Sequence, residues 1–194
     1  MDIRTREDVL LVLEQHWKWL LHPERGKCAK FKDVDFSEME IDFSGLDLRK
    51  VEFEKCNLYG VNFCNANLAE ATFNESQVSC LSMQNANLYS VKFIRCTMLQ
   101  VNFIDANVER TAFAGGKFHK CNFHKAKLID NYFKFARFYD CDFSDIVLRD
   151  ARIRLLLFKN CALCNANISG EWCEIITDDC DERNMVKTNE IEKY

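Results

Sequence analysis

Cysteine and histidine side chains in the second half of the chain are the first candidates for chemistry. Cys161 and Cys164 form a C-x-x-C sequence, a spacing found in redox pairs and in zinc sites. His119, Cys121 and His124 lie close together along the chain, and an imidazole within hydrogen-bond reach of a thiol can activate it as a nucleophile. Either site would work only if the fold turns these side chains toward one another.

An apolar repeat of five residues determines which way the side chains point. Every fifth residue from Phe43 to Ile168 is apolar, at 26 positions without an exception. This period fits neither a helix, on which five residues advance by about 500°, nor one straight strand, on which successive fives alternate between faces. A coil whose turn holds a whole number of fives would keep all these central residues inside.

Each group of five has a regular internal pattern. The residue two before each central residue, which we call the companion, is usually small or apolar, so the two lie on one side of a short extended segment. The residue between them points outward and is often Asn or Asp. The other two residues must turn the corner into the next segment.

The distribution of phenylalanine indicates how many segments close one turn. Phe occupies ten of 13 central positions in the alternate set that begins at Phe43, and three of 13 in the other set. This favours an even number, and four segments, which make a square turn, leave room for an interior. Residues four segments apart, such as Cys121, Cys141 and Cys161, then stack in one column. Hydrogen bonds between turns would satisfy the buried amides.

Several segments carry a known family motif. Ala66-Asn67-Leu68 and Ala86-Asn87-Leu88 resemble the A(D/N)LXX unit of the pentapeptide repeat protein family. The resemblance covers about two thirds of the chain and implies an all-β solenoid, a right-handed quadrilateral β-helix with a packed interior. It implies little about activity, since members range from topoisomerase-protecting proteins to proteins of unknown role.

A solenoid needs caps, because each end exposes an apolar interior. We therefore expect one domain in four segments: an N-terminal helix cap (1–26), an irregular first coil (27–42), the pentapeptide-repeat β-helix (43–170), and a C-terminal cap with an acidic tail (171–194). Thr5 and Asp8 resemble a capping box, and an apolar stripe that includes Leu13 and Trp17 predicts an amphipathic helix over residues 6–22. Its two Trp residues would also suit a partner-binding helix.

Apolar residues mark both ends of the repeat. Phe31, Phe36 and Ile41 also recur every five residues, but two residues out of phase with Phe43 onward, so that Ile41 changes from a central residue to a companion. At the other end, we expect three residues to plug the last coil: Trp172, Ile175 and Ile176.

The repeat argues against the candidate chemistry. Its phase turns Cys161 into the rod and Cys164 out of it, and places His119 and His124 on different faces. We therefore predict a protein that is not an enzyme, with no catalytic residues, no cofactor and no metal site. Eleven cysteines in a chain with a charged N-terminus and no membrane-length apolar run predict reduced thiols and a cytoplasmic location.

Cations gather in the C-terminal third of the rod. Residues 116–170 hold 10 basic and 5 acidic residues, and residues 171–194 hold 3 basic and 8 acidic ones. Stacking residues four segments apart assembles a candidate interaction face, which we call the basic face: Lys117, His119, Lys120, Arg137, Tyr139 and Lys159. It would suit an acidic protein surface or a phosphate backbone. The alternative is a solvated surface that keeps the rod soluble.

A second surface is apolar. Six residues at outward or corner positions would mark a protein contact if they were contiguous: Ile94, Leu99, Ile104, Phe135, Leu155 and Leu157.

These features favour a non-catalytic protein-interaction scaffold with an unknown partner, present as a monomer or as a homodimer joined through its terminal caps. The alternative is a DNA mimic that binds or protects a type II topoisomerase such as DNA gyrase. Mimicry needs an acidic surface, whereas residues 41–170 carry 16 basic and 13 acidic residues. Direct nucleic-acid binding through the basic face is disfavoured, because cations interleaved with aromatic residues are not evident in the sequence.

Overall fold

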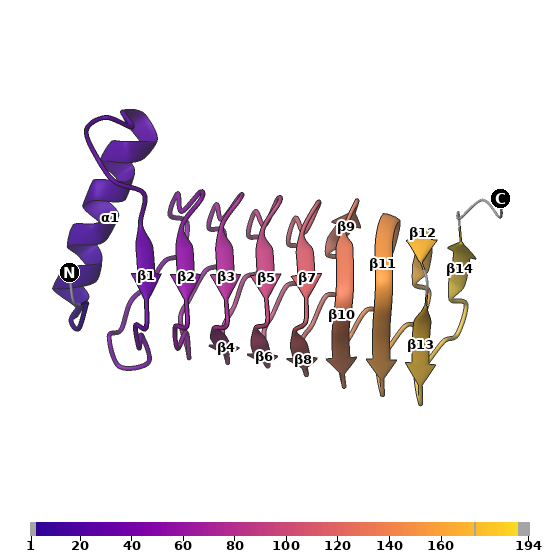
Figure 1. The fold of residues 1–194 in the computed structure, drawn as a ribbon. Helices are drawn as coiled ribbons and strands as arrows, with labels where there is room; N and C mark the ends of the chain where they lie inside the picture. Colours follow the sequence, from indigo (N-terminus) through magenta and orange to yellow (C-terminus); the bar gives the residue numbers. More distant parts are fainter. Residues whose placement is uncertain (1–2, 173, 190–194) are drawn as a thin grey trace.

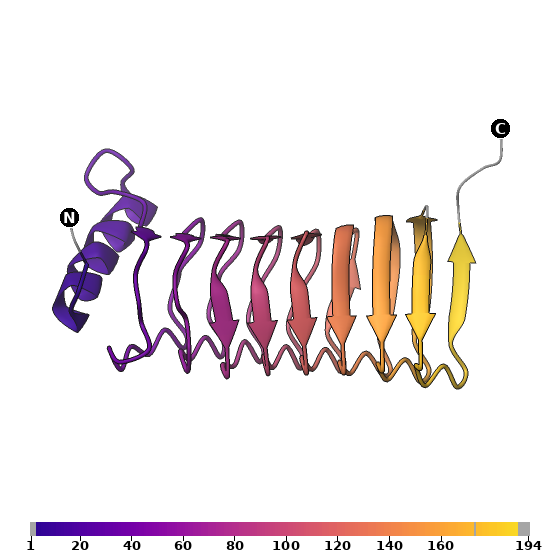
Figure 2. The same ribbon diagram turned by 60° about the horizontal axis from the view of Figure 1, so that its bottom comes forward.

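The computed structural model describes residues 3–172 and 174–189, which form a parallel β-solenoid with one helix at the N-terminal end (Figure 1). Helix α1 (Arg6–Leu21) precedes the coils. The strands of the described residues are β1 (Lys30–Lys32), β2 (Glu52–Glu54), β3 (Thr72–Asn74), β4 (Gln77–Ser79), β5 (Lys92–Ile94), β6 (Thr97–Leu99), β7 (Ala112–Ala114), β8 (Lys117–His119), β9 (Lys127–Ile129), β10 (Tyr132–Tyr139), β11 (Val147–Lys159), β12 (Asn167–Trp172), β13 (Ile175–Asp178) and β14 (Val186–Asn189). Seen from another side, the coils stack into a straight rod (Figure 2). The predicted solenoid and its helical cap are confirmed.

Parallel pairing between strands of successive turns builds the rod. Phe53 lies opposite Phe73, and Phe73 opposite Phe93, across β2, β3 and β5. The spacing is the same on another side, where Val78 lies opposite Met98 across β4 and β6. Four five-residue segments therefore make one turn, as the alternation of phenylalanine predicted.

The corners explain the composition of the outward positions. Corner residues such as Asn65 and Asp105 have φ of 59° and 57°, in the left-handed region that Gly, Asn and Asp tolerate best. An outward Asn or Asp stabilises the next corner, because its side-chain oxygen accepts a hydrogen bond from a backbone N–H two residues on. The Asn62 Oδ1, for example, accepts from the N–H of Cys64 at 3.0 Å.

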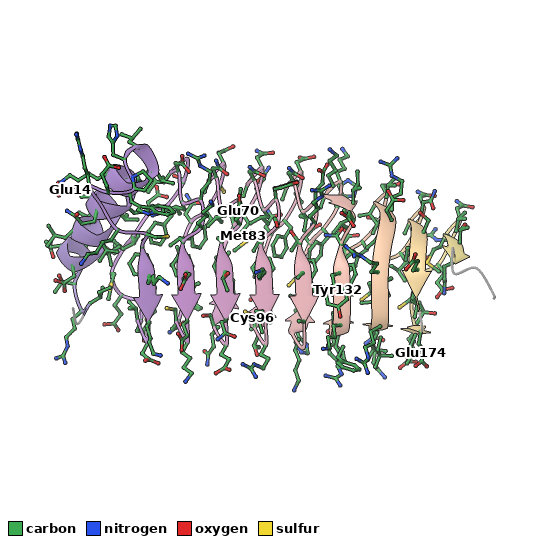
Figure 3. All side chains as sticks on the ribbon, turned by 45° about the horizontal axis from the view of Figure 1, so that its top comes forward. Glu14, Glu70, Met83, Cys96, Tyr132 and Glu174 are labelled. Carbon is green, nitrogen blue, oxygen red and sulfur yellow. The ribbon has the colours of Figure 1, made fainter. Side chains whose placement is uncertain are left out.

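Central residues fill the interior, and all 26 from Phe43 to Ile168 are buried. Phe113 and Phe133 stack between turns with ring centroids 5.1 Å apart, and Phe113 meets Phe123 of the opposite side nearly edge-on at 6.3 Å. Figure 3 shows the side chains along the whole rod, where the labelled Met83 is buried and the labelled Tyr132 is exposed. The rod is therefore filled by side chains.

Polar companions bond to the backbone of the preceding turn. The Cys96 thiol donates to the carbonyl of Phe73 at 3.2 Å, and the Thr111 hydroxyl donates to the carbonyl of Leu88 at 2.7 Å. The acceptor lies 23 residues earlier in both cases. Four other side chains share this relationship: Ser76, Asn131, Cys141 and Cys161. Each gives a backbone carbonyl a partner, which accounts for thiol and hydroxyl groups at inward positions.

The first coil contains two additional residues, as its apolar phase predicted. Asp42 lies opposite Asn62 at the regular spacing of four segments, whereas Phe31 lies opposite Phe53, two residues beyond that spacing. Ile41 is buried as a companion. The insertion is therefore absorbed within the first coil and leaves the later turns in register.

Helix α1 covers the N-terminal end of the rod. The predicted capping box is present: the Thr5 hydroxyl accepts from the N–H of Asp8, and the Asp8 carboxylate accepts from the N–H of Thr5. Val9 and Leu13 are buried with the core of the first coil. The helix is neither long enough nor apolar enough to cross a membrane, and it is the one helix in the described residues.

The buried face of α1 is narrower than the predicted stripe, because Leu10 and Leu21, which belong to that stripe, are 47% and 77% exposed. His16 is fully buried, whereas Trp17 is 38% exposed. His16 follows Leu13 by three residues and so continues the same helix face, which turns Trp17 toward the edge. Because His16 is polar, a pattern of apolar residues does not identify it as part of the buried face.

At the C-terminal end the coil continues past the expected boundary at residue 170. β13 pairs with β11 and β14 pairs with β12, so the described part of segment 171–194 adds coil instead of a separate cap. The spacing between residues opposite each other in successive turns shortens here by one residue, so that Leu156 lies opposite Ile175. Thr177 therefore takes the central position opposite Phe158. This shift and a polar central residue break the apolar pattern. Of the residues expected to plug the last coil, Ile175 packs against the core, but Ile176 is 38% exposed and does not plug it. The Trp172 side chain and residues 173 and 190–194, also assigned to the cap, lie outside the described residues.

Candidate interaction surface

The coil register brings the predicted basic face together. Lys117 lies opposite Arg137, and His119 opposite Tyr139, across β8 and β10. Tyr139 also lies opposite Lys159, across β10 and β11. These residues share one side of the rod over three consecutive turns, where the predicted columns placed them.

The charge of the basic face is only partly neutralised. Lys159 Nζ lies 2.7 Å from Asp178 Oδ2, and the hydrogen bond to this carboxylate raises the pKa of Lys159. The ion pairs among the described residues include neither Lys117, nor Arg137, nor Lys120 at the corner after β8. These three cations are therefore available to an anionic partner.

An aromatic stack stiffens the centre of the face. The His119 and Tyr139 rings are 4.6 Å apart between centroids and 9° from parallel. Because each ring restricts the other, a partner that contacts them removes less side-chain freedom on binding.

Strand β10 extends this surface around a corner to the next side of the rod. Its outward side chains alternate aromatic rings with cations: Tyr132, Lys134, Phe135, Arg137 and Tyr139. The order of residues along the chain does not reveal this interleaving of cations and rings, so the stated reason against nucleic-acid binding is wrong for this strand. The inward Phe133 and Phe138 conceal the pattern in the sequence, and Lys134 and Phe135 both point outward because they form the corner that leads into the next segment.

Phe135 holds an unusual place on this strand. Its φ of 56° lies in the left-handed region, which strains a bulky side chain. It is the one aromatic residue with positive φ in the described part of the chain. The ring is 39% exposed, and Cζ of Arg154 lies 5.2 Å from its centroid. A strained backbone that supports an exposed ring marks Phe135 as a candidate contact residue.

The exposed apolar residues do not form the single patch that the sequence suggested. Leu99 and Phe135 are 40% and 39% exposed, but they lie on β6 and β10. The other four are less exposed: Ile94, Ile104 and Leu157 are half-buried, as is Leu155. Ile94 lies on β5, in the column of β3 and β7, whereas Leu99 lies in the column of β4 and β8.

The two cysteines of the C-x-x-C sequence face different environments. Cys161 is buried and donates to the carbonyl of Phe138 at 3.5 Å, while Cys164 is half-buried. A hydrogen bond with Cys141, together with burial, raises the pKa of the Cys161 thiol. No group of three or more His, Cys, Asp or Glu residues within 3–172 and 174–189 is arranged to hold a metal ion.

The histidine and cysteine cluster does not form a catalytic set. The Cys121 thiol donates to the backbone carbonyl of His119 at 3.5 Å, not to its ring. His124 Nδ1 lies 3.2 Å from Ser144 Oγ and 3.8 Å from Asp145 Oδ2. Both contacts involve the same ring nitrogen, so the imidazole cannot relay a proton between the serine and the carboxylate as a catalytic triad does.

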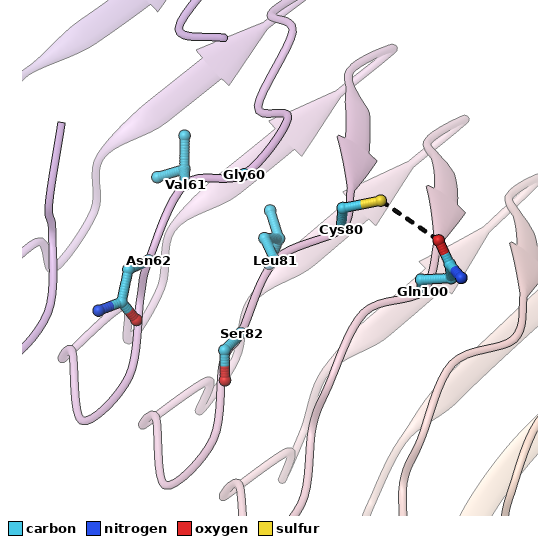
Figure 4. Close-up of a pocket in the computed structure, with 7 residues that line it drawn as sticks. All are labelled: Gly60, Val61, Asn62, Cys80, Leu81, Ser82 and Gln100. Atoms are coloured by element: carbon cyan, nitrogen blue, oxygen red, sulfur yellow. Dashed lines mark hydrogen bonds between the residues drawn. The ribbon is translucent and has the colours of Figure 1, made fainter. Parts of the chain in front are cut away.

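A shallow hollow of about 470 Å³ exposes one thiol at a corner of the rod (Figure 4). Its lining residues are Gly60, Val61, Asn62, Cys80, Leu81, Ser82 and Gln100. The Cys80 thiol donates to Gln100 Oε1 at 3.3 Å. This lining holds no base that would activate the thiol, so the surface of β10 is the stronger candidate.

Two family models match the sequence. One, described as a pentapeptide repeat region, matches residues 46–117, and the other, described as pentapeptide repeats (8 copies), matches residues 109–145. Together they span more than half of the chain. Among curated proteins, none matches the sequence significantly.

Solved structures resemble the rod. A trypsin-treated variant of QnrB1, a plasmid-mediated fluoroquinolone resistance protein, aligns with a TM-score of 0.56 at 17% identity, over 84% of this chain and 85% of that one. HetL, a pentapeptide repeat protein involved in heterocyst differentiation regulation from the cyanobacterium Nostoc sp. strain PCC 7120, aligns with a TM-score of 0.43 at 15% identity, over 88% and 93% of the two chains. At such identity, the likeness to QnrB1 concerns the fold alone.

Proposed function

The chain belongs to the pentapeptide repeat family, and we propose that it acts as a non-catalytic scaffold that binds an acidic surface of another protein on its basic face. The observation that carries this proposal is the set of unpaired cations Lys117, Lys120 and Arg137 on adjacent turns. The parallel ladder of β8 and β10 fixes the backbone of Lys117 and Arg137, and the N–H of Lys120 donates to the carbonyl of Tyr139 at 2.9 Å, so binding orders little of the main chain. Charges in such an array attract and orient a partner of opposite sign.

We also propose a cytoplasmic location. All ten cysteines in the described residues are free. Burial raises the pKa of Cys96 to about 12, so this thiol stays protonated and serves as a hydrogen-bond donor within the core. Unpaired thiols in this number fit a reducing compartment.

Charge reversal tests the scaffold proposal. In the variant Lys117→Glu/Arg137→Glu we expect loss of the proteins that the immobilised wild type captures from a cell extract, measured by quantitative mass spectrometry. The control Lys55→Glu/Lys125→Glu makes the same change of charge at two corners outside the basic face. Capture that is unchanged in the first variant, or lost equally in both, would contradict the proposal.

A second variant tests the same face in the opposite direction. Asp178 neutralises Lys159 at 2.7 Å, so Asp178→Asn releases this cation while keeping a side chain of similar size. We expect the partners captured by the wild type to be retained at higher salt. Exposed ion pairs contribute little to stability, so the fold should be unaffected.

Binding to a type II topoisomerase is the alternative function. The motivation is that QnrB1, whose structure shares this fold, is a fluoroquinolone resistance protein. The charge of residues 41–170, with 16 basic and 13 acidic residues, argues against mimicry of DNA. A gyrase supercoiling assay with and without a quinolone tests it: if an excess of the protein leaves both reactions unchanged, this alternative is wrong.

A further inference from the structure

We propose that four residues at the corner of β10 and β11, which we call the aromatic corner, bind single-stranded nucleic acid: Tyr132, Lys134, Phe135 and Arg154. The inference goes beyond the scaffold function, because it assigns a different class of ligand to a neighbouring side of the rod. It rests on three observations: accessible ring faces, uncompensated positive charge, and a strained backbone under one of the rings.

The first observation concerns the rings. Tyr132 and Phe135 are each 39% exposed, and Tyr132 is labelled in Figure 3. In the preceding turn, the residue opposite Tyr132 is Ala112. The residue at the same corner as Phe135, one turn earlier, is Gly115, whose N–H donates to the carbonyl of Lys134 at 2.8 Å. Neither small residue can cover the neighbouring ring, so both rings offer a face to a planar group.

Arg154 supports the other side of Phe135. Its Cζ lies 5.2 Å from the ring centroid, which places a guanidinium group beside the ring. A base stacked on the open face of Phe135 would therefore have a phosphate-binding cation close by. Stacking on an aromatic ring next to a cation is how proteins hold single strands without reading their sequence.

The second observation is the charge of this side of the rod. This side is made of β5, β7, the first half of β10 and the part of β11 that pairs with it, together with the corner after each. Its outward side chains include five cations and no carboxylate: Lys92, Arg95, Lys134, Arg152 and Arg154. Arg95 pairs with Glu75 and Arg152 with Asp130. Among the described residues, the other three take part in no ion pair. Lys92, Lys134 and Arg154 are therefore open to a polyanion, whereas Arg95 and Arg152 are already paired with carboxylates.

The third observation is the backbone of Phe135. Its φ of 56° disfavours an aromatic residue, and packing does not compensate, because the ring is not in the core. An acidic peptide would use the cations but not the rings, and a duplex keeps its bases stacked within the helix. A single strand uses both the cations and the ring faces, and it is the ligand that this arrangement favours.

Fluorescence anisotropy with a labelled oligothymidylate of about 16 nucleotides tests the proposal. We expect Tyr132→Ala and Phe135→Asn each to weaken binding about fivefold or more. Asn suits the corner conformation, so Phe135→Asn should fold even if other changes there do not. Tyr59→Ala removes a ring that is 54% exposed in an early turn and should leave binding unchanged.

Salt dependence tests the cations separately. For single strands, each phosphate contact contributes about 0.7 to the slope of log affinity against log salt. Replacing both cations in Lys134→Gln/Arg154→Gln should reduce that slope by about 1.4. Circular dichroism should confirm that each variant keeps the β-rich spectrum of the wild type.

Several results would overturn the proposal. In the first, the ring variants bind the oligonucleotide as tightly as the wild type does. In the second, a duplex of equal length binds the wild type as tightly as the single strand. In the third, polyglutamate displaces the oligonucleotide equally from the wild type and from the ring variants. Each would mean that the rings play no part. Such a result would leave the scaffold function standing, because that function depends on Lys117, Lys120 and Arg137 and is measured by protein capture.

Discussion

The backbone N–H of Ala29 donates a hydrogen bond to Nδ1 of His16 at 3.1 Å and thereby joins the cap helix to the first coil. His16 is fully buried, and its Nε2 has no hydrogen-bond partner among the described residues. Because Nδ1 accepts this bond, the ring is neutral and carries its proton on Nε2. Protonation of Nδ1 would remove the bond and place a charge in the core.

Acid should therefore destabilise the cap. Burial lowers the pKa of His16, with Asp47 opposing the shift and Arg49 adding to it. Between the lowered pKa and the ordinary value of about 6.5, the unfolded chain binds a proton that the folded protein does not, so stability falls as the pH is lowered through this window. We expect the midpoint of thermal unfolding to be constant above pH ~7 and to fall below pH ~6.5.

His16→Asn provides the matched control for this prediction. Its side-chain oxygen can accept the N–H of Ala29, but the residue does not titrate. The variant should be less stable at every pH, because a smaller side chain leaves space in the core. The part of the pH dependence that the wild type shows just below pH ~6.5 should disappear. If the two pH profiles remain parallel, His16 is not the responsible group.

The hydrogen bond of a companion residue can be measured at Cys96. Its thiol donates to the Phe73 carbonyl at 3.2 Å, and Ser76, one turn earlier in the same column, donates its hydroxyl to the Phe53 carbonyl in the same way. Cys96→Ser should therefore keep the bond, whereas Cys96→Ala removes it. We expect Cys96→Ser to be more stable than Cys96→Ala by about 1 kcal/mol in urea denaturation. Equal stability would mean that the bond contributes nothing net.

The five-residue period predicts most of the fold because it acts at the level of packing. It assigns a direction to each side chain, and the register then places Lys117 beside Arg137 and His119 beside Tyr139 as the columns require. The same period fails after Ile168, where the spacing shortens by one residue and a polar Thr177 takes a central position. A pattern read from apolar residues cannot follow a coil whose interior positions become polar.

The aromatic corner shows the other limit of the sequence. Lys134 and Arg154 are four segments apart, so stacking the segments in columns places them together. In the turn before Lys134, however, the outward residues Ala112, Ala114 and Gly115 carry no charge, so the sequence shows no continuous row of cations on that side. Whether an outward ring is accessible depends on its neighbours in the adjacent turns. The exposed faces of Tyr132 and Phe135 therefore become apparent only when those turns are placed beside them.

Thiol reactivity should divide the cysteines by position. Cys80 is exposed at a corner, whereas burial raises the pKa of Cys96 to about 12 and that of Cys56 to about 11. Since the thiolate is the reactive form, iodoacetamide at pH ~8 should label Cys80 in the native protein and the two buried thiols only when the chain opens. Mass spectrometry of timed samples checks this order. In Cys80→Ser the fast modification at that site should be absent, and native labelling of Cys96 as fast as that of Cys80 would contradict the buried assignment.

Phe135→Asn should separate stability from binding. A residue other than Gly in the left-handed region costs roughly 1–2 kcal/mol, and Asn tolerates it better than an aromatic residue. The substitution also removes the contact with Arg154, which at an exposed site is worth about 0.5–1 kcal/mol. The relief of strain is the larger effect, so we expect the free energy of unfolding to rise by up to about 1 kcal/mol, equivalent to a melting temperature about 2–4 °C higher. Phe135→Leu keeps an apolar side chain in the strained conformation and should show no such gain. A clear loss of stability in Phe135→Asn would mean that the ring is retained for packing, whereas a gain in stability with weaker oligonucleotide binding would indicate that the strain at this corner is retained for function.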